Sequence, residues 1–118
     1  MGLAIAKTLA AEGCKVAICG RTSETLEQAV ASAAEGEPLR WTRCDVADRE
    51  EVKQIFAWFE DELGPLDILV NCAGTNVAKR MMADLDPAEF DQVMTANLTG
   101  TASAGLDRSM PMPLGEYE

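Results

Sequence analysis

The strongest constraint on the fold of this chain is a regular alternation of short apolar runs with amphipathic segments. Residues 16–19 and 68–70 are unbroken apolar runs, which is typical of strands covered on both faces. Residues 39–44 mostly alternate apolar with polar, which is typical of an edge strand with one wet face. Helical segments separate these runs, and the connections are short. The sequence therefore predicts an α/β fold with a parallel sheet.

Helical segments flank the three predicted strands. The first runs from the start of the chain to Gly13, where a left-handed turn commonly stops a helix. The second begins at the capping pair Thr22 and Ser23 and is closed by Gly36 and Pro38.

Two further helices have their own start signals. Asp48 with Glu51 three residues later resembles a capping box before an apolar stripe, and Asp86 precedes Pro87 at the first position of a fourth helix. One face of that helix carries Phe90, Val93, Met94 and Asn97. Asn97 therefore lies on the apolar side, where a buried polar group needs a partner.

Composition excludes several classes of function. With 118 residues the chain suits one domain, and its net charge of −10 leaves no positive field for nucleic acid or anionic lipid. The absence of histidine excludes Ser-His-Asp and Cys-His catalytic pairs within the chain and removes the commonest nitrogen ligand of zinc, so we predict no metal site. No apolar run approaches the ~20 residues of a membrane helix.

The four cysteines are typical of small buried hydrophobes. They have no C-x-x-C spacing, and they are Cys14, Cys19, Cys44 and Cys72. The start of the chain carries neither a secretory signal nor a lipid-anchor signal. We therefore expect a reducing, cytoplasmic compartment.

Candidate site residues follow the three predicted strands. Ligands of open parallel sheets bind beyond the carboxyl ends of the strands. Those ends are followed by Arg21, by Asp45 with Val46, and by residues 71–74.

The order of these motifs resembles the short-chain dehydrogenase/reductase family. Asp45 and Val46 follow one strand, Asn-Cys-Ala-Gly at 71–74 follows the next, and Asn97 lies in the following helix. The match runs from residue 2 to about residue 101 and is nearest to bacterial 3-oxoacyl-acyl-carrier-protein reductases. The resemblance implies a Rossmann-like, doubly wound parallel sheet, of which residues 1–105 form a part. Residues 106–118, where periodicity ends and prolines occur, are expected to be a disordered tail.

The resemblance also implies missing parts at both ends. Only Gly2 corresponds to the family's Gly-rich loop T-G-x-x-x-G-x-G, as its final glycine. The family's first strand, expected between strands 16–19 and 68–70, precedes that loop, and its C-terminal strands would follow the chain. We therefore expect a truncated chain with a gap in its sheet. Its cofactor binding would be weakened because the loop's N–H groups hold the pyrophosphate.

The resemblance assigns cofactor-binding roles to the strand ends. Arg21 occupies a position near the adenosine ribose, and its guanidinium suits a 2′-phosphate, so NADP(H) is preferred and NAD(H) is the second choice. Asp45 corresponds to an aspartate that faces the adenine, with Val46 packed nearby. The alternatives are a solvated arginine opening a helix and an aspartate that merely forms a turn.

The segment after the third strand matches the family's N-N-A-G, with Cys72 in place of the second asparagine. Ala73 and Gly74 would let the backbone pass close to the cofactor ribose, and Asn71 would tie neighbouring strands; an ordinary turn is the alternative. Asn97 resembles the helix asparagine that supports a water in the proton relay. Its alternative is a capping or bridging role.

The family's catalytic serine and its Tyr-x-x-x-Lys have no counterpart here. The single tyrosine, Tyr117, has one residue after it, and Ser103 and Ser109 lie too early. The resemblance implies an NADP(H)-dependent oxidoreductase that moves hydride between nicotinamide and a carbonyl or alcohol substrate. We expect this chain alone to be inactive. The alternative is a non-catalytic nucleotide-binding or oligomerising module that pairs its open sheet with another chain.

Overall fold

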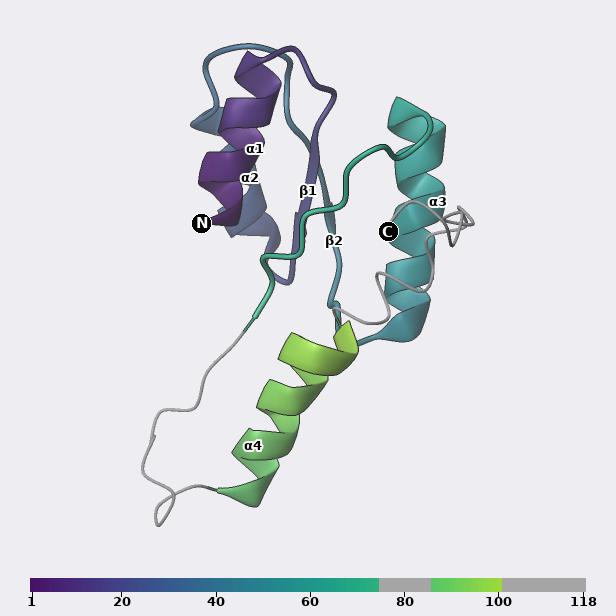
Figure 1. Ribbon diagram of the computed structural model, residues 1–118. Helices are drawn as coiled ribbons and strands as arrows, with labels where there is room; N and C mark the ends of the chain where they lie inside the picture. The colour runs from purple at the N-terminus through teal and green to yellow at the C-terminus, as the bar shows by residue number, and fades with distance from the viewer. Residues whose placement is uncertain (75–85, 101–118) are drawn as a thin grey trace, which may run out of the picture.

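The computed structural model describes residues 1–74 and 86–100 of the chain (Figure 1). The elements in order are α1 (Gly2–Ala11), β1 (Ala17–Gly20), α2 (Ser23–Ala31), β2 (Arg40–Arg43), α3 (Arg49–Leu63), α4 (Pro87–Met94) and a π-helical turn η2 (Thr95–Thr99). The predicted α/β class is confirmed. Helices α1 and α2 lie on one side of the two strands and α3 lies on the other (Figure 1).

The two strands are parallel, as the crossover through α2 requires. Their register places Ala17 opposite Arg40 and Gly20 opposite Arg43. The ladder is extended beyond the strand end, because the N–H of Cys44 donates to the carbonyl of Gly20 at 2.9 Å. Both strands therefore end at the same edge of the sheet, as the site prediction requires.

Each side of the sheet has its own small apolar cluster. Ala6, Ala10 and Leu39 form the first cluster under α1 and α2, and Cys44 with Val52 form the second under α3. Leu3 of α1 and Val30 of α2 pack against the first cluster, and Ile55 and Phe56 of α3 pack against the second. Apolar burial of this kind is the main stabilising contribution to the layers.

Glycines with positive φ lie in the connections that follow α1 and α2; α2 itself ends at Ala31, before the predicted stop at Gly36. Gly13 has φ 85° directly after α1, and Gly36 has φ 81° in the connection to β2. The backbone of Gly36 lies against the carbonyl of Ala10, and the N–H of Glu37 donates to that oxygen at 3.1 Å. The turn after α2 is therefore fastened to the end of α1.

The predicted strand at 68–70 does not form. Leu69 packs against the second cluster, but Ile68 is 60% exposed and Val70 is 45% exposed. A strand needs a hydrogen-bonded neighbour. Within residues 1–74 and 86–100, the only ladder joins β1 to β2. The apolar pattern indicated burial correctly for Leu69 and wrongly for the residues on either side.

Helix α4 begins as predicted, with the carboxylate of Asp86 accepting the N–H of Ala88 at 2.9 Å. Its apolar face is not covered in the part of the chain that the structure describes: Phe90 is 45% exposed and Met94 is 40% exposed. Asn97 is also exposed, so the prediction that it is buried on the apolar side of the helix is wrong. The reason is that α4 projects below the two layers instead of packing on them (Figure 1).

Some expectations fall outside the described residues. The predicted tail, 106–118, lies there, as do Ser103 and the end of the predicted domain. Among the helices that are described, none has the length and apolar character of a membrane span.

Candidate functional site

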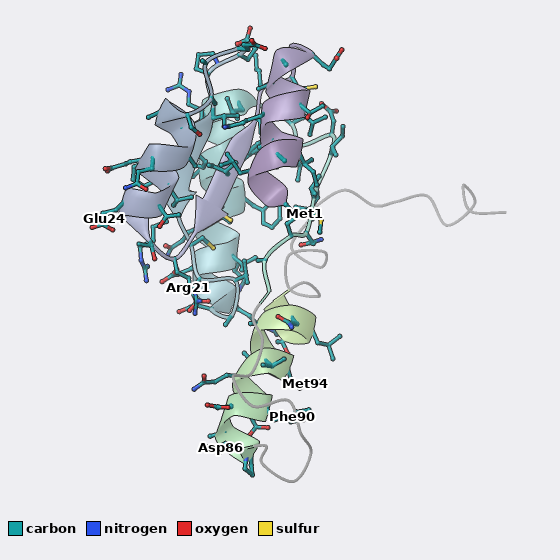
Figure 2. The ribbon with its side chains drawn as sticks, turned by 90° about the vertical axis from the view of Figure 1, so that its left-hand side faces the viewer. Met1, Arg21, Glu24, Asp86, Phe90 and Met94 are labelled. Carbon is teal, nitrogen blue, oxygen red and sulfur yellow. The ribbon has the colours of Figure 1, made fainter. Side chains whose placement is uncertain are left out.

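The carboxyl end of the sheet exposes a positively charged side chain after β1. Arg21 directly follows this strand and is exposed, at the end of the sheet beyond which α4 lies (Figure 2). No ion pair joins its guanidinium to another described residue. A guanidinium without a carboxylate partner is available to an anion.

The turn after β2 is held through three atoms of Asp45. The N–H of Asp45 donates to a carboxylate oxygen of Glu51 at 2.6 Å. The Oδ1 atom of Asp45 accepts the N–H of Ala47 at 3.0 Å, and its carbonyl accepts the N–H of Asp48 at 2.9 Å. Asp45 and Val46 are half-buried, so this turn is fixed and still reachable by solvent.

Helix α3 supplies the groups that hold this turn. Asp48 caps the helix, with its Oδ1 atom accepting the N–H of Glu50 at 2.9 Å and that of Glu51 at 3.2 Å. The Glu51 carboxylate accepts from Asp45 and forms an ion pair with Arg43 at 3.1 Å. The predicted capping box is therefore half right, because Glu51 bonds to the preceding turn. The D-x-x-E spacing was the signal that could have drawn attention to Glu51.

Close backbone approaches bring the other predicted residues together. A Cβ atom on Gly2 would lie 3.1 Å from the Cβ of Cys72, and one on Gly74 would lie 3.1 Å from the Oδ1 of Asn97. The segment 71–74 therefore passes between the start of α1 and the π-helical turn η2. Small residues are required at both crossings.

A third close approach was missed by the sequence analysis. A Cβ atom on Gly100 would lie 2.9 Å from both the Cγ2 and the carbonyl oxygen of Val46. Gly100 is buried, and it joins the end of η2 to the turn after β2. The signal in the sequence was a glycine directly after a helix, which sequence reasoning treats as a helix stop.

The remaining predicted site residues are exposed. Asn71, Ala73 and Gly74 are all exposed, and within residues 1–74 and 86–100 no hydrogen bond joins Asn71 to a strand. At the start of α1, the carbonyl of Met1 accepts the N–H groups of Ala4 and Ile5 at 3.1 and 3.3 Å. The first N–H groups of the helix precede these donors and are the ones a helix offers to an anion.

The thiols of Cys19 and Cys44, near the carboxyl ends of β1 and β2, have raised pKa values. Burial is the main cause that raises the pKa of the Cys44 thiol to about 12, and the neighbouring groups of Cys19, Glu51 and Asp45 contribute to the same shift. The pKa of Cys19 is also raised, mainly by desolvation. Because the thiolate is the reactive form, Cys44 is a packing residue at neutral pH and not a nucleophile.

These groups fit the adenosine end of a dinucleotide. An unpaired guanidinium suits a 2′-phosphate, and a half-buried aspartate with an adjacent valine suits a base edge and face. The amino end of α1 beside small residues suits a phosphate. The described residues contain no group of three or more His, Cys, Asp or Glu side chains that could hold a metal ion.

Comparison with known proteins decides the family. The sequence profile of the short chain dehydrogenase family matches residues 1–107. The chain belongs to this family. The predicted resemblance is therefore confirmed.

Relatives of several activities share this part of the fold. The short-chain reductase protein NovJ of Streptomyces niveus is 38% identical over 102 residues, which are 86% of this chain and 38% of NovJ. The 2,3-dihydro-2,3-dihydroxybenzoate dehydrogenase of Bacillus subtilis is 36% identical over 105 residues, 88% of this chain and 40% of the relative. The 3-oxoacyl-[acyl-carrier-protein] reductase MabA of Mycobacterium tuberculosis is 38% identical over 117 residues, 99% of this chain and 43% of MabA.

Solved structures agree with the fold. A variant of actinorhodin polyketide ketoreductase crystallised with NADPH has a TM-score of 0.83 and 32% identity, covering 90% of this chain and 41% of the ketoreductase. Serine dehydrogenase from Escherichia coli, at 24% identity, has a TM-score of 0.79 and supports the fold alone. The chain thus spans about two fifths of the length of these relatives.

Proposed function

We propose that this short chain dehydrogenase binds NADP(H) at the carboxyl end of its sheet, as part of an oxidoreductase that moves hydride between nicotinamide and a small carbonyl or alcohol substrate. The observation that carries the proposal is Arg21, exposed after β1 and free of ion pairs among the described residues. A 2′-phosphate is the anion that distinguishes NADP(H) from NAD(H). The ketoreductase crystallised with NADPH supports the choice of cofactor.

The residues that this proposal assigns to the cofactor come from three segments. Arg21 takes the 2′-phosphate, Asp45 and Val46 take the adenine, and the segment 71–74 passes along the ribose. Gly2 lies where the first turn of α1 approaches the pyrophosphate. When bound, the cofactor would supply hydride chemistry, and these residues orient it.

Turnover by the 118-residue chain alone is not expected. The sequence contains no Tyr-x-x-x-Lys, so the proton donor and the lysine that lowers its pKa have no counterpart. Asn97 is proposed only to support a proton relay. The chain by itself is therefore proposed to bind cofactor without reducing a carbonyl.

The proposal is tested by urea unfolding with and without saturating NADPH. A ligand that binds only the folded chain raises its stability, by about 2.7 kcal/mol at a hundredfold excess over Kd. We expect a cooperative transition that NADPH shifts upward more than NADH does. A cooperative transition that neither nucleotide shifts would overturn the proposed cofactor site. NADPH oxidation above the blank with a ketone would overturn the proposed lack of turnover.

A second candidate function is an oligomerising module, and one observation favours it. The carbonyls of Val16 and Gly20 accept hydrogen bonds from the β2 side. Ala17 and Cys19 alternate with these residues along the strand. Their N–H and C=O groups therefore point toward the opposite edge of β1. That edge is paired with no described strand, and such an edge can pair with another chain. Sedimentation over a wide range of concentration tests this candidate, and a monomer throughout would contradict it.

A further inference from the structure

Helix α3 controls the turn that carries Asp45 and Val46. We infer that Glu51 is a positioning residue, which holds the turn after β2 in the shape that the adenosine end of NADP(H) requires. The inference rests on the proposed function and assigns a role to a residue of α3 that does not itself contact the cofactor.

The contact between Glu51 and the turn is short and charge-assisted. The Glu51 carboxylate accepts the N–H of Asp45 at 2.6 Å, and this bond is partly buried. Hydrogen bonds from a backbone N–H to a carboxylate are about twice as strong as neutral ones. The bond therefore contributes more to the position of Asp45 than its other two hydrogen bonds, which stay within the turn.

Glu51 is itself held rigidly. It lies in the first turn of a helix whose N-cap Asp48 accepts its N–H, and the next residue, Val52, is only 1% exposed within the second apolar cluster. The carboxylate thus connects a fixed helix to the strand end. A binding group supported in this way keeps its geometry, whereas an unsupported loop does not.

The ion pair with Arg43 does not explain the arrangement. Its arginine side chain is 54% exposed and its glutamate 29%, and exposed pairs contribute little. Glu50, at the adjacent position, makes a more exposed ion pair with Lys53, in which the glutamate side chain is 75% exposed, and it makes no hydrogen bond to the turn. Glu50 is therefore a matched control for the loss of one negative charge at the start of α3.

Two substitutions separate the reach of Glu51 from its charge. Glu51→Asp keeps the negative charge that favours a helix N-terminus but shortens the side chain by one methylene. Glu51→Gln removes the charge but keeps an acceptor oxygen that can reach the N–H of Asp45. If Glu51 acted only through its charge or by stabilising the helix, Glu51→Asp would bind NADPH more tightly than Glu51→Gln. A positioning role predicts the reverse.

The experiment measures NADPH affinity by calorimetry for the wild type, Glu51→Asp, Glu51→Gln and Glu50→Ala, with urea unfolding to establish that each is folded. We expect Glu51→Asp to weaken binding about tenfold, Glu51→Gln to weaken it less, about threefold, because a neutral acceptor still reaches the N–H of Asp45, and Glu50→Ala to stay within about twofold of wild type. Amide hydrogen exchange at Asp45, measured without ligand, should be fastest in Glu51→Asp, intermediate in Glu51→Gln and unchanged in Glu50→Ala.

The outcomes distinguish this inference from the proposed function. If the folded wild type does not bind NADPH, the proposed function fails and this inference fails with it. If the wild type binds and Glu51→Asp binds equally well, the inference alone is overturned. Equal exchange of the Asp45 amide in all four proteins would also overturn it, whatever the affinities.

Discussion

The two arginines that end the parallel strands have different partners. Arg43, the last residue of β2, is paired with Glu51 at 3.1 Å, while Arg21, just after β1, has no such partner among the described residues. Both side chains are exposed, so exposure to solvent does not distinguish them. The difference is geometric, because α3 begins directly after β2 and brings a carboxylate to that strand end.

Removing the guanidinium of Arg21 should change cofactor selectivity. We expect Arg21→Ala to weaken NADPH binding about tenfold and to leave NADH binding nearly unchanged, because only NADPH offers a 2′-phosphate. Arg40→Ala is the control, since Arg40 is an exposed arginine at the other end of β2. Calorimetric titration of both nucleotides measures the ratio. An equal loss for NADPH in the two variants would contradict the assignment.

Cys44 should make stability fall in alkaline solution. Its pKa in the folded chain, about 12, lies above the ordinary value of 9.0. The unfolded chain therefore releases the proton first, so this stabilising contribution is complete below pH 9.0 and is lost as the pH rises toward 12. In Cys44→Ala the urea midpoint should decline less steeply with pH over this range. In Cys72→Ala, at an exposed position, the decline should be the same as in the wild type. A decline of the same slope in both variants would refute this account.

At the residue scale the sequence located the strand ends but not their partners. Arg21, Asp45 and Val46 were placed correctly after strands, because an apolar run indicates where a strand ends. The exposure of Asn97 was not foreseen, since periodicity identifies a helix face but not whether another layer covers it. The partner of Glu51 was not foreseen either, because its carboxylate could accept from the N–H of Asp48, as in a capping box, or from the N–H of Asp45.

At the scale of elements, the glycines in the connections after α1 and α2 have different roles. Gly13 and Gly36 share a positive φ, of 85° and 81°. A Cβ atom on Gly13 would meet nothing within 4 Å, whereas one on Gly36 would collide with the backbone of Ala10. Gly13 is needed for its conformation alone, and Gly36 also for the space it leaves.

The pair predicts unequal costs of the same substitution. Gly13→Ala should lower the free energy of unfolding by about 1 kcal/mol, the usual penalty of a left-handed residue. Gly36→Ala should lower it by roughly 3 kcal/mol, because strain and a backbone collision add. Urea unfolding of both variants measures the difference. Equal losses would mean that the turn after α2 is not fastened to α1 as described.

The N-termini of the helices could be predicted from the sequence because they depend on local capping residues. The pairing of strands could not be predicted in this way. The caps of α3 and α4 were located from Asp48 and Asp86, whose carboxylates accept helix N–H groups as expected. The segment 68–70 has the composition of a buried strand and does not become one. Strand formation depends on a neighbour elsewhere in the chain, which no local pattern reports.

At the scale of the whole molecule, burial is distributed unevenly. Helix α4 contains no buried residue, whereas α1 contains Ala6 and Ala10. Local opening is easiest where few apolar contacts resist it. We expect backbone amides of α4 to exchange with solvent far faster than those of α1 under native conditions. Comparable protection of the two helices, measured by hydrogen exchange, would show that α4 is covered in solution.

The two apolar clusters share no side chain, although the same two strands run between them. The layers are therefore coupled through the backbone ladder of β1 and β2 and through the segment after α3, where Leu69 packs on the second cluster and Cys72 lies against Gly2 of α1. A chain built this way can lose α3 together with its cluster while α1, α2 and the strands stay assembled. Such an opening would be a rare local event in the native chain, and it would keep Arg21 in place but release the helix that holds Asp45.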